Sequence, residues 1–148
     1  MKLGRAVRVG FGQVLSVPIY LAYEAIVRLA NADRMAASRP GIDDDWVQRI
    51  VGVCGDLDLG SIRLVERSRI PTRHEGITFG STVFVTRELS PMDERDMRLL
   101  LHELTHVRQG RRFGRLGMAR RYGVEWCRCL SYTDHPLEIE ARKAERLA

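Results

Sequence analysis

The chain has 148 residues, of which 45% are hydrophobic and 29% are charged, and its formal net charge is +5. This composition excludes a disordered or low-complexity protein, and three cysteines are too few for a disulfide framework. The length suits one domain, in which we expect an N-terminal helical segment, residues 1–55, to pack on a core formed by residues 56–148.

The first predicted element is a helix within residues 10–30, which are mostly apolar and follow three basic residues: Lys2, Arg5 and Arg8. A membrane span needs about 20 mainly apolar residues, and Glu24 and Arg28 interrupt this run. We therefore expect a packed helix. The alternatives are a helix that lies on a membrane surface through residues 10–30 and a cleaved signal peptide. The few cysteines favour a cytoplasmic protein, with membrane association or export as alternatives.

The middle of the chain predicts a helix followed by strands. After a break at residues 39–41, residues 44–54 predict a helix with an apolar side that contains Trp46, Val47, Ile50, Val51 and Cys54. Residues 61–66 alternate between polar and apolar, which predicts a short strand. Residues 77–86, ITFGSTVFVT, are rich in β-branched and aromatic side chains and predict one longer strand.

The second half predicts three helices. The first takes Ser90 as its cap and Pro91 as its first residue, and runs to about Gln109, just before Gly110. Residues 114–130 and 136–147 predict the other two. Helices, a small sheet and then helices indicate an α+β fold.

The motif His102-Glu103-Leu104-Thr105-His106 lies within the first of these helices. Histidines four residues apart leave the same helix face, where two imidazoles can take two corners of a zinc site. In such sites the glutamate lies beside the metal and takes a proton from the metal-bound water as general base. The motif therefore predicts one catalytic Zn²⁺ per chain, with Glu103 as the catalytic residue.

A catalytic zinc needs a third protein ligand, and the C-terminal segment offers three candidates. Glu138 and Glu140 lie near the start of the last predicted helix, and His135 precedes it. Residues two apart on a helix point in different directions, so only one of the two glutamates can bind the metal.

Peptide hydrolysis also requires a group that stabilises the oxyanion, and the candidates are Tyr122, Tyr132, His135 and His74. A run of arginines between residues 108 and 128 carries few aromatic neighbours. We interpret this run as a solvated helix face and expect no specific nucleic-acid partner.

Three segments carry a family resemblance: ITFGSTVFV, LLHELTHVRQ and HPLEIEARKAE. The stretch Gly76–Glu145 resembles the gluzincin clan of zinc peptidases. More closely, these segments resemble the metallopeptidase core family found with extracellular contractile injection systems, and the compact minigluzincins. The resemblance covers about residues 60–148 and implies a zincin-like fold with a small sheet, an active-site helix and a C-terminal glutamate helix.

The resemblance also implies roles for individual residues. The family's Glu-x-Glu-Ala pattern falls on residues 138–141 and implies Glu138 as the third ligand, with Glu140 as the alternative. Arg142 stands where the clan usually has Asp. The resemblance therefore assigns no residue to accept a hydrogen bond from a histidine ligand and orient its ring. In zincins a strand above the active-site helix binds the substrate backbone. Here the resemblance places that strand at Ile77–Val85, around Phe79, Gly80, Ser81 and Thr82.

We therefore expect a zinc-dependent metallopeptidase that hydrolyses a peptide or protein substrate by Glu-assisted attack of a zinc-bound water. The alternative is a catalytically inactive zincin-fold module for binding or effector delivery, associated with a membrane through its N-terminal helix. The sequence predicts neither the cleavage specificity nor the oligomeric state.

Overall fold

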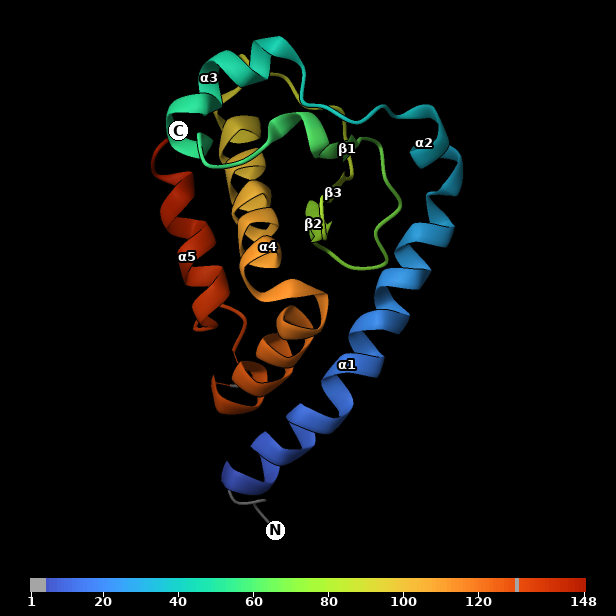
Figure 1. Ribbon diagram of the computed structural model, residues 1–148, viewed down its shortest axis with the longest axis vertical. Helices are drawn as coiled ribbons and strands as arrows, with labels where there is room; N and C mark the ends of the chain where they lie inside the picture. Colours follow the sequence, from blue (N-terminus) through green and yellow to red (C-terminus); the bar gives the residue numbers. More distant parts are fainter. Residues whose placement is uncertain (1–4, 130) are drawn as a thin grey trace.

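A computed structural model describes residues 5–129 and 131–148, with the side chains of residues 14–125, 127–129 and 131–148. The predicted α+β class is confirmed (Figure 1). In chain order the elements are α1 (Arg5–Ala30), α2 (Ala32–Ala37), α3 (Asp44–Cys54), a short 3-10 helix (Leu59–Ser61), β1 (Arg63–Val65), β2 (Gly76–Phe79), β3 (Thr82–Val85), α4 (Glu94–Cys129) and α5 (Pro136–Glu145).

The sheet has three short strands in the order β1-β3-β2, with β1 parallel and β2 antiparallel to β3. The prediction of one strand over residues 77–86 was therefore wrong, because the segment folds back on itself as a β-hairpin. Its two-residue loop is Gly80 and Ser81, and Gly80 has φ of +63°. A positive φ at the first loop position is typical of a type II′ turn, where glycine carries no steric cost.

The sheet lies between two helical layers, with α1 against one face and α4 against the other (Figure 1). Phe79 and Phe84 pack with Val27 of α1, and Val83 and Val85 pack toward Leu100 and Leu104 of α4. The strand register explains which side chains face α1 and which face α4, because residues paired across two strands point to the same face of the sheet.

Helix α3 covers the α4 side of this core. Its observed bounds match the predicted residues 44–54, and it buries Trp46, Ile50 and Cys54, which are spaced by one turn. Val51 was also expected on the apolar side, but 51% of its surface is exposed because it lies beyond the edge of that narrow stripe. Thus α3 covers the core on the side of α4.

Helix α4 differs from its predicted limits at both ends. It begins at Glu94, and its cap is Asp93, whose carboxylate accepts the backbone N–H of Arg95 at 2.8 Å. Ser90, the expected cap, instead accepts the N–H of Met92 in the preceding turn. The helical path breaks at Gly114, which has φ of 70°, and not at Gly110. Leu130, where the next helix was expected to end, lies outside the described residues.

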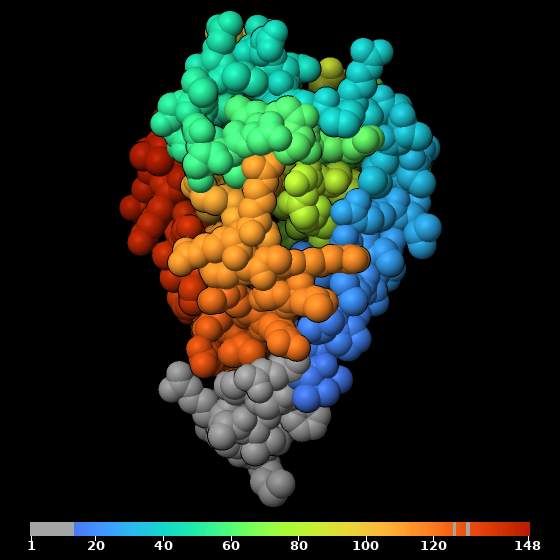
Figure 2. All heavy atoms as spheres, in the orientation of Figure 1, coloured from blue at the N-terminus to red at the C-terminus, as the bar shows by residue number. Residues whose placement is uncertain are grey.

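Helix α1 runs along α4 (Figure 2, blue and orange). Its Glu24 is 4% exposed and accepts hydrogen bonds from Arg28 at 2.8 Å and Arg115 at 2.7 Å. Arg28 also reaches the carbonyl of Phe79 at 3.2 Å. These bonds join α1 to the sheet and to the part of α4 beyond Gly114.

The described part of the chain contains no helix with the length and apolarity that crossing a membrane requires. The basic residues expected to start the N-terminal segment, Lys2, Arg5 and Arg8, have side chains outside the described part.

Candidate metal centre

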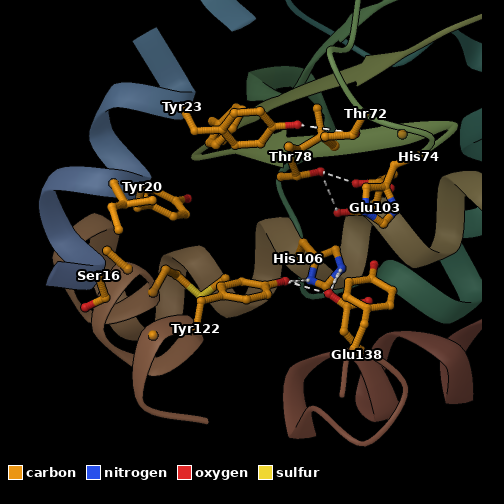
Figure 3. Close-up of a pocket in the computed structure, with 18 of the residues that line it drawn as sticks. Ser16, Tyr20, Tyr23, Thr72, His74, Thr78, Glu103, His106, Tyr122 and Glu138 are labelled. Carbon is orange, nitrogen blue, oxygen red and sulfur yellow. Dashed lines mark hydrogen bonds and ion pairs between the residues drawn. The ribbon is translucent and has the colours of Figure 1, made fainter. Parts of the chain in front are cut away.

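Three side chains from α4 and α5, His102, His106 and Glu138, come together. Figure 3 shows two of them, His106 and Glu138, beneath the sheet. His102 Nε2 lies 3.1 Å from His106 Nε2, and the two carboxylate oxygens of Glu138 lie 3.3 Å from His102 Nε2 and 3.5 Å from His106 Nε2. One ligand atom from each of the three lies within 4.8 Å of the others. The group could hold a metal ion.

Local structure explains why these three residues meet. His102 and His106 are one turn apart on α4 and therefore share a face. The ring of His135 accepts the N–H of Leu137 at 3.3 Å and so caps α5, with Pro136 as its first residue. The cap places Glu138 in the first turn of α5, where it is 1% exposed and points at the two histidines.

The two glutamates that the sequence left as alternatives have different surroundings. Glu138 belongs to the three-residue group, whereas Glu140 is exposed and accepts a hydrogen bond from Gln109 Nε2 at 3.0 Å. Their separation by two residues accounts for the difference, because they lie on different sides of α5. His135, the third candidate, is fully buried in its capping role.

The electrostatics of the group favour a cation. Burial alone would raise the pKa of Glu138, but the close contacts of its carboxylate with the imidazoles of His102 and His106 hold that pKa well below its usual range. Burial alone would lower the pKa of His106, yet its contact with Glu138 and the charge of Glu103 raise it to about 9. A buried carboxylate between two imidazoles therefore attracts positive charge, whether as protons or as a metal ion.

The donor set also fits zinc. Two imidazole nitrogens and one carboxylate oxygen are the His₂Glu set of known catalytic zinc sites. Glu138 Oε2 is buried without a hydrogen-bond partner among the described residues, which is costly unless a cation completes its surroundings. The residues present therefore fit a zinc ion.

A second layer of hydrogen bonds orients the three side chains, and the sequence analysis missed most of it. Glu145 Oε1 accepts the Nδ1–H of His102 at 2.6 Å, and Gln109 Oε1 accepts that of His106 at 2.8 Å. Tyr122 donates its hydroxyl hydrogen to Glu138 Oε1 at 2.8 Å. Glu145 thus supplies the histidine support left unassigned by Arg142, whose side chain bonds the carbonyl of Thr133 instead.

Replacing Glu145 with alanine is expected to weaken zinc binding by about 10- to 100-fold, because His102 loses the acceptor that fixes its ring orientation. Zinc affinity is measured by competition with a chromophoric chelator. Glu88→Ala is the matched control. Glu88 is also an exposed glutamate with a side-chain partner, but that partner is Arg67 and not a residue of the metal centre. Equal zinc affinity in Glu145→Ala and the wild type would contradict the role of Glu145.

Glu103 lies beside the group and not within it. Its Oε2 accepts the hydroxyl of Thr78 on β2 at 2.7 Å, and a β-carbon at position 76 would lie 2.5 Å from its Oε1. Any larger residue at position 76 would therefore displace this carboxylate from its position. Burial raises the pKa of Glu103, and the two histidines and Thr78 offset only part of that rise. A raised pKa suits a carboxylate that accepts and returns a proton.

The oxyanion candidates have different positions. The ring of Tyr122 stacks on that of His135 with centroids 4.6 Å apart, and its hydroxyl is bonded to Glu138. Tyr132 is 38% exposed, and its ring lies 5.1 Å from that of His74. Tyr132 borders the same cavity as Glu103, whereas His135 does not.

The residues expected on the substrate strand lie at the hairpin end. Gly80 and Ser81 form the turn, and the side chains of Phe79 and Thr82 are buried on the α1 face of the sheet. The strand segment that lies next to Glu103 is Gly76–Thr78 in β2, at one edge of the sheet. This is a correction to the single strand expected over Ile77–Val85.

Comparison with known proteins gives one match. A family model described as the eCIS core domain matches residues 56–114, which supports the resemblance to the family associated with contractile injection systems. The matched segment contains the sheet and the part of α4 with His102, Glu103 and His106, and it ends before Glu138. None of the curated proteins compared matches the chain, and neither does any solved structure.

Proposed function

We propose that the protein is a zinc-dependent peptidase, with His102, His106 and Glu138 as metal ligands and Glu103 as general base and acid. The observation that carries the proposal is the convergence of these three ligand-type side chains within 4.8 Å. Its support comes from the buried Glu103 carboxylate next to them and from the cavity that Glu103, His106 and Glu138 line. A structural zinc site has four protein ligands, whereas a catalytic site keeps one position open.

A bound zinc ion would polarise the peptide carbonyl and lower the pKa of the attacking water. Glu103 accepts the proton of that water and then donates it to the leaving amine. Thr78 holds the Glu103 carboxylate in place, and the raised pKa of Glu103 suits both directions of the transfer. Tyr132 is the group that we assign to the oxyanion, because it is 38% exposed at the border of the cavity, whereas the hydroxyl of Tyr122 is bonded to Glu138.

Metal removal tests this proposal. We expect the purified protein to contain one zinc per chain by elemental mass spectrometry and to cleave members of a diverse peptide mixture, with products identified by mass spectrometry. A chelator is expected to abolish cleavage and added zinc to restore it. Cleavage that survives complete metal removal would contradict the proposal.

The match to the eCIS core domain supports an association with extracellular contractile injection systems as part of the same proposal. Within such a system the fold would serve either as a peptidase or as an inactive module for binding or delivery. One zinc per chain without cleavage of any peptide would favour the inactive module.

A further inference from the structure

A cavity of about 580 Å³ opens beside the candidate metal centre. Glu103, His106 and Glu138 lie on one side of it, and β2 with the loop at Thr72 and His74 borders another. Figure 3 shows Tyr20 and Tyr23 of α1 pointing into the same space from the side opposite the metal centre. The N-terminal helix is therefore a wall of the cavity that contains the candidate catalytic group.

This wall is held in place and does not fill the cavity. Tyr20 and Tyr23 pack edge-on against Phe79, with ring centroids 5.5 Å and 5.9 Å away. The hydroxyl of Tyr23 donates to Thr72 at 3.3 Å, and the bond from Arg115 to Glu24, the next residue of the helix, also fixes α1 in place. The cavity volume stays open with α1 in this position. Helix α1 thus has the position of a binding wall and not of a plug.

Away from the metal centre, most of the cavity lining is apolar. Helix α1 contributes Leu15, Ile19 and Tyr20, and the part of α4 beyond Gly114 contributes Met118 and Ala119. The ionisable lining groups on α1 are Tyr20 and Tyr23. The others are Glu103, His106 and Glu138 at the metal centre, His74 on the loop, Cys127 near the end of α4, and the tyrosines Tyr122 and Tyr132. A charged ligand group would meet no countercharge on the α1 side and would lose its hydration there, whereas an apolar group gains from the burial.

We infer that this cavity binds a bulky apolar side chain of a peptide substrate, next to the bond that is cleaved, and that α1 determines this preference. The inference rests on the proposed function. Continuity supports this occupant, because one cavity joins the apolar wall to Glu103 and His106 without a partition. The volume is also in the range of cavities that enclose small-molecule ligands, so large side chains such as Phe and Leu fit.

Two matched variants on α1 test the inference. Ile19 lines the cavity and is 64% exposed, whereas Ile26 does not line it and is 54% exposed. Ile19→Asp is expected to lower kcat/KM about 10-fold or more for peptides cleaved next to Phe or Leu, in the range that pocket contacts contribute. Ile26→Asp is expected to cleave these peptides like the wild type. Both positions are exposed, so neither substitution removes a core side chain.

A binding measurement separates this inference from the proposed function, because it requires no hydrolysis. Phenylalanine hydroxamate and alanine hydroxamate share the metal-binding group and differ only in side chain. We expect the zinc-loaded wild type to bind the phenylalanine compound more tightly by calorimetry, about 10-fold. Ile19→Asp should lose this difference, and Ile26→Asp should keep it.

The outcomes are distinct. Equal binding of the two hydroxamates by the wild type, including binding of neither, would overturn the inference, as would a difference that survives in Ile19→Asp. Selective binding without cleavage of any peptide would support the apolar preference of the cavity and the role of α1 in it, and would contradict the proposed hydrolysis. Metal-dependent cleavage with no preference for apolar side chains would overturn the inference and leave the proposed function intact.

Discussion

Zinc binding is expected to fall by at least about 100-fold when Glu138 is replaced by glutamine, because loss of an outer partner alone costs 10- to 100-fold and Glu138 is itself a ligand in our proposal. The substitution keeps the size of the side chain and removes the charge that lies 3.3 Å and 3.5 Å from the two histidines. Competition with a chromophoric chelator gives the affinity, and circular dichroism checks the fold.

Glu140→Gln is the control for this experiment, since it makes the same change two residues further along α5. Glu140 is exposed and contacts the centre only through Gln109, so we expect zinc affinity close to that of the wild type. Loss of zinc in Glu140→Gln together with retention in Glu138→Gln would reverse the assignment of the third ligand.

Peptide hydrolysis is expected to fall by about 10²- to 10⁴-fold in kcat when Glu103 is replaced by glutamine, the range that a general acid–base contributes. Glutamine can still accept the hydrogen bond from Thr78, but it cannot take a proton from water. Zinc content should remain at one per chain, because Glu103 lies outside the ligand group. Steady-state kinetics and elemental mass spectrometry measure the two quantities separately.

Glu94→Gln provides the matched control for Glu103→Gln. It lies on the same helix, is exposed and pairs with Arg98, so both kcat and zinc content should equal those of the wild type. If Glu103→Gln also cleaved peptides at the wild-type rate, Glu103 would not be the general base, and the mechanism proposed above would be wrong.

Much of the fold follows from local sequence signals, and the main error has a local explanation. The helix limits of residues 44–54 were predicted correctly from the apolar spacing and the preceding break. The hairpin was missed because β-branched and aromatic residues flank Gly80 and Ser81 on both sides and hide the turn within one apolar run. Gly-Ser between two such runs is itself a hairpin signal, so the sequence contained the correction.

The candidate site, like the fold, could be predicted only where a local sequence pattern determines the positions of its residues. The four-residue spacing alone predicted that His102 and His106 lie on the same face, because one helix carries both. The supporting residues depend on how α5 lies against α4, which no local pattern determines. Glu145 follows Glu138 by two helical turns and so lies on the same face, and that spacing was the available signal for its role. The bond between Tyr122 and Glu138 depends on the path of the chain beyond Gly114 and had no such signal.

Because β2 is short, the edge of the sheet can form few backbone hydrogen bonds with another chain. An exposed edge strand offers unpaired backbone groups to any extended chain, and natural proteins restrict this aggregation hazard by keeping such strands short. Strand β2 spans only Gly76–Phe79, so a segment added along it gains few backbone hydrogen bonds. Two copies of the protein consequently have little to gain from edge-to-edge pairing, and a peptide that binds along β2 takes most of its affinity from side-chain burial.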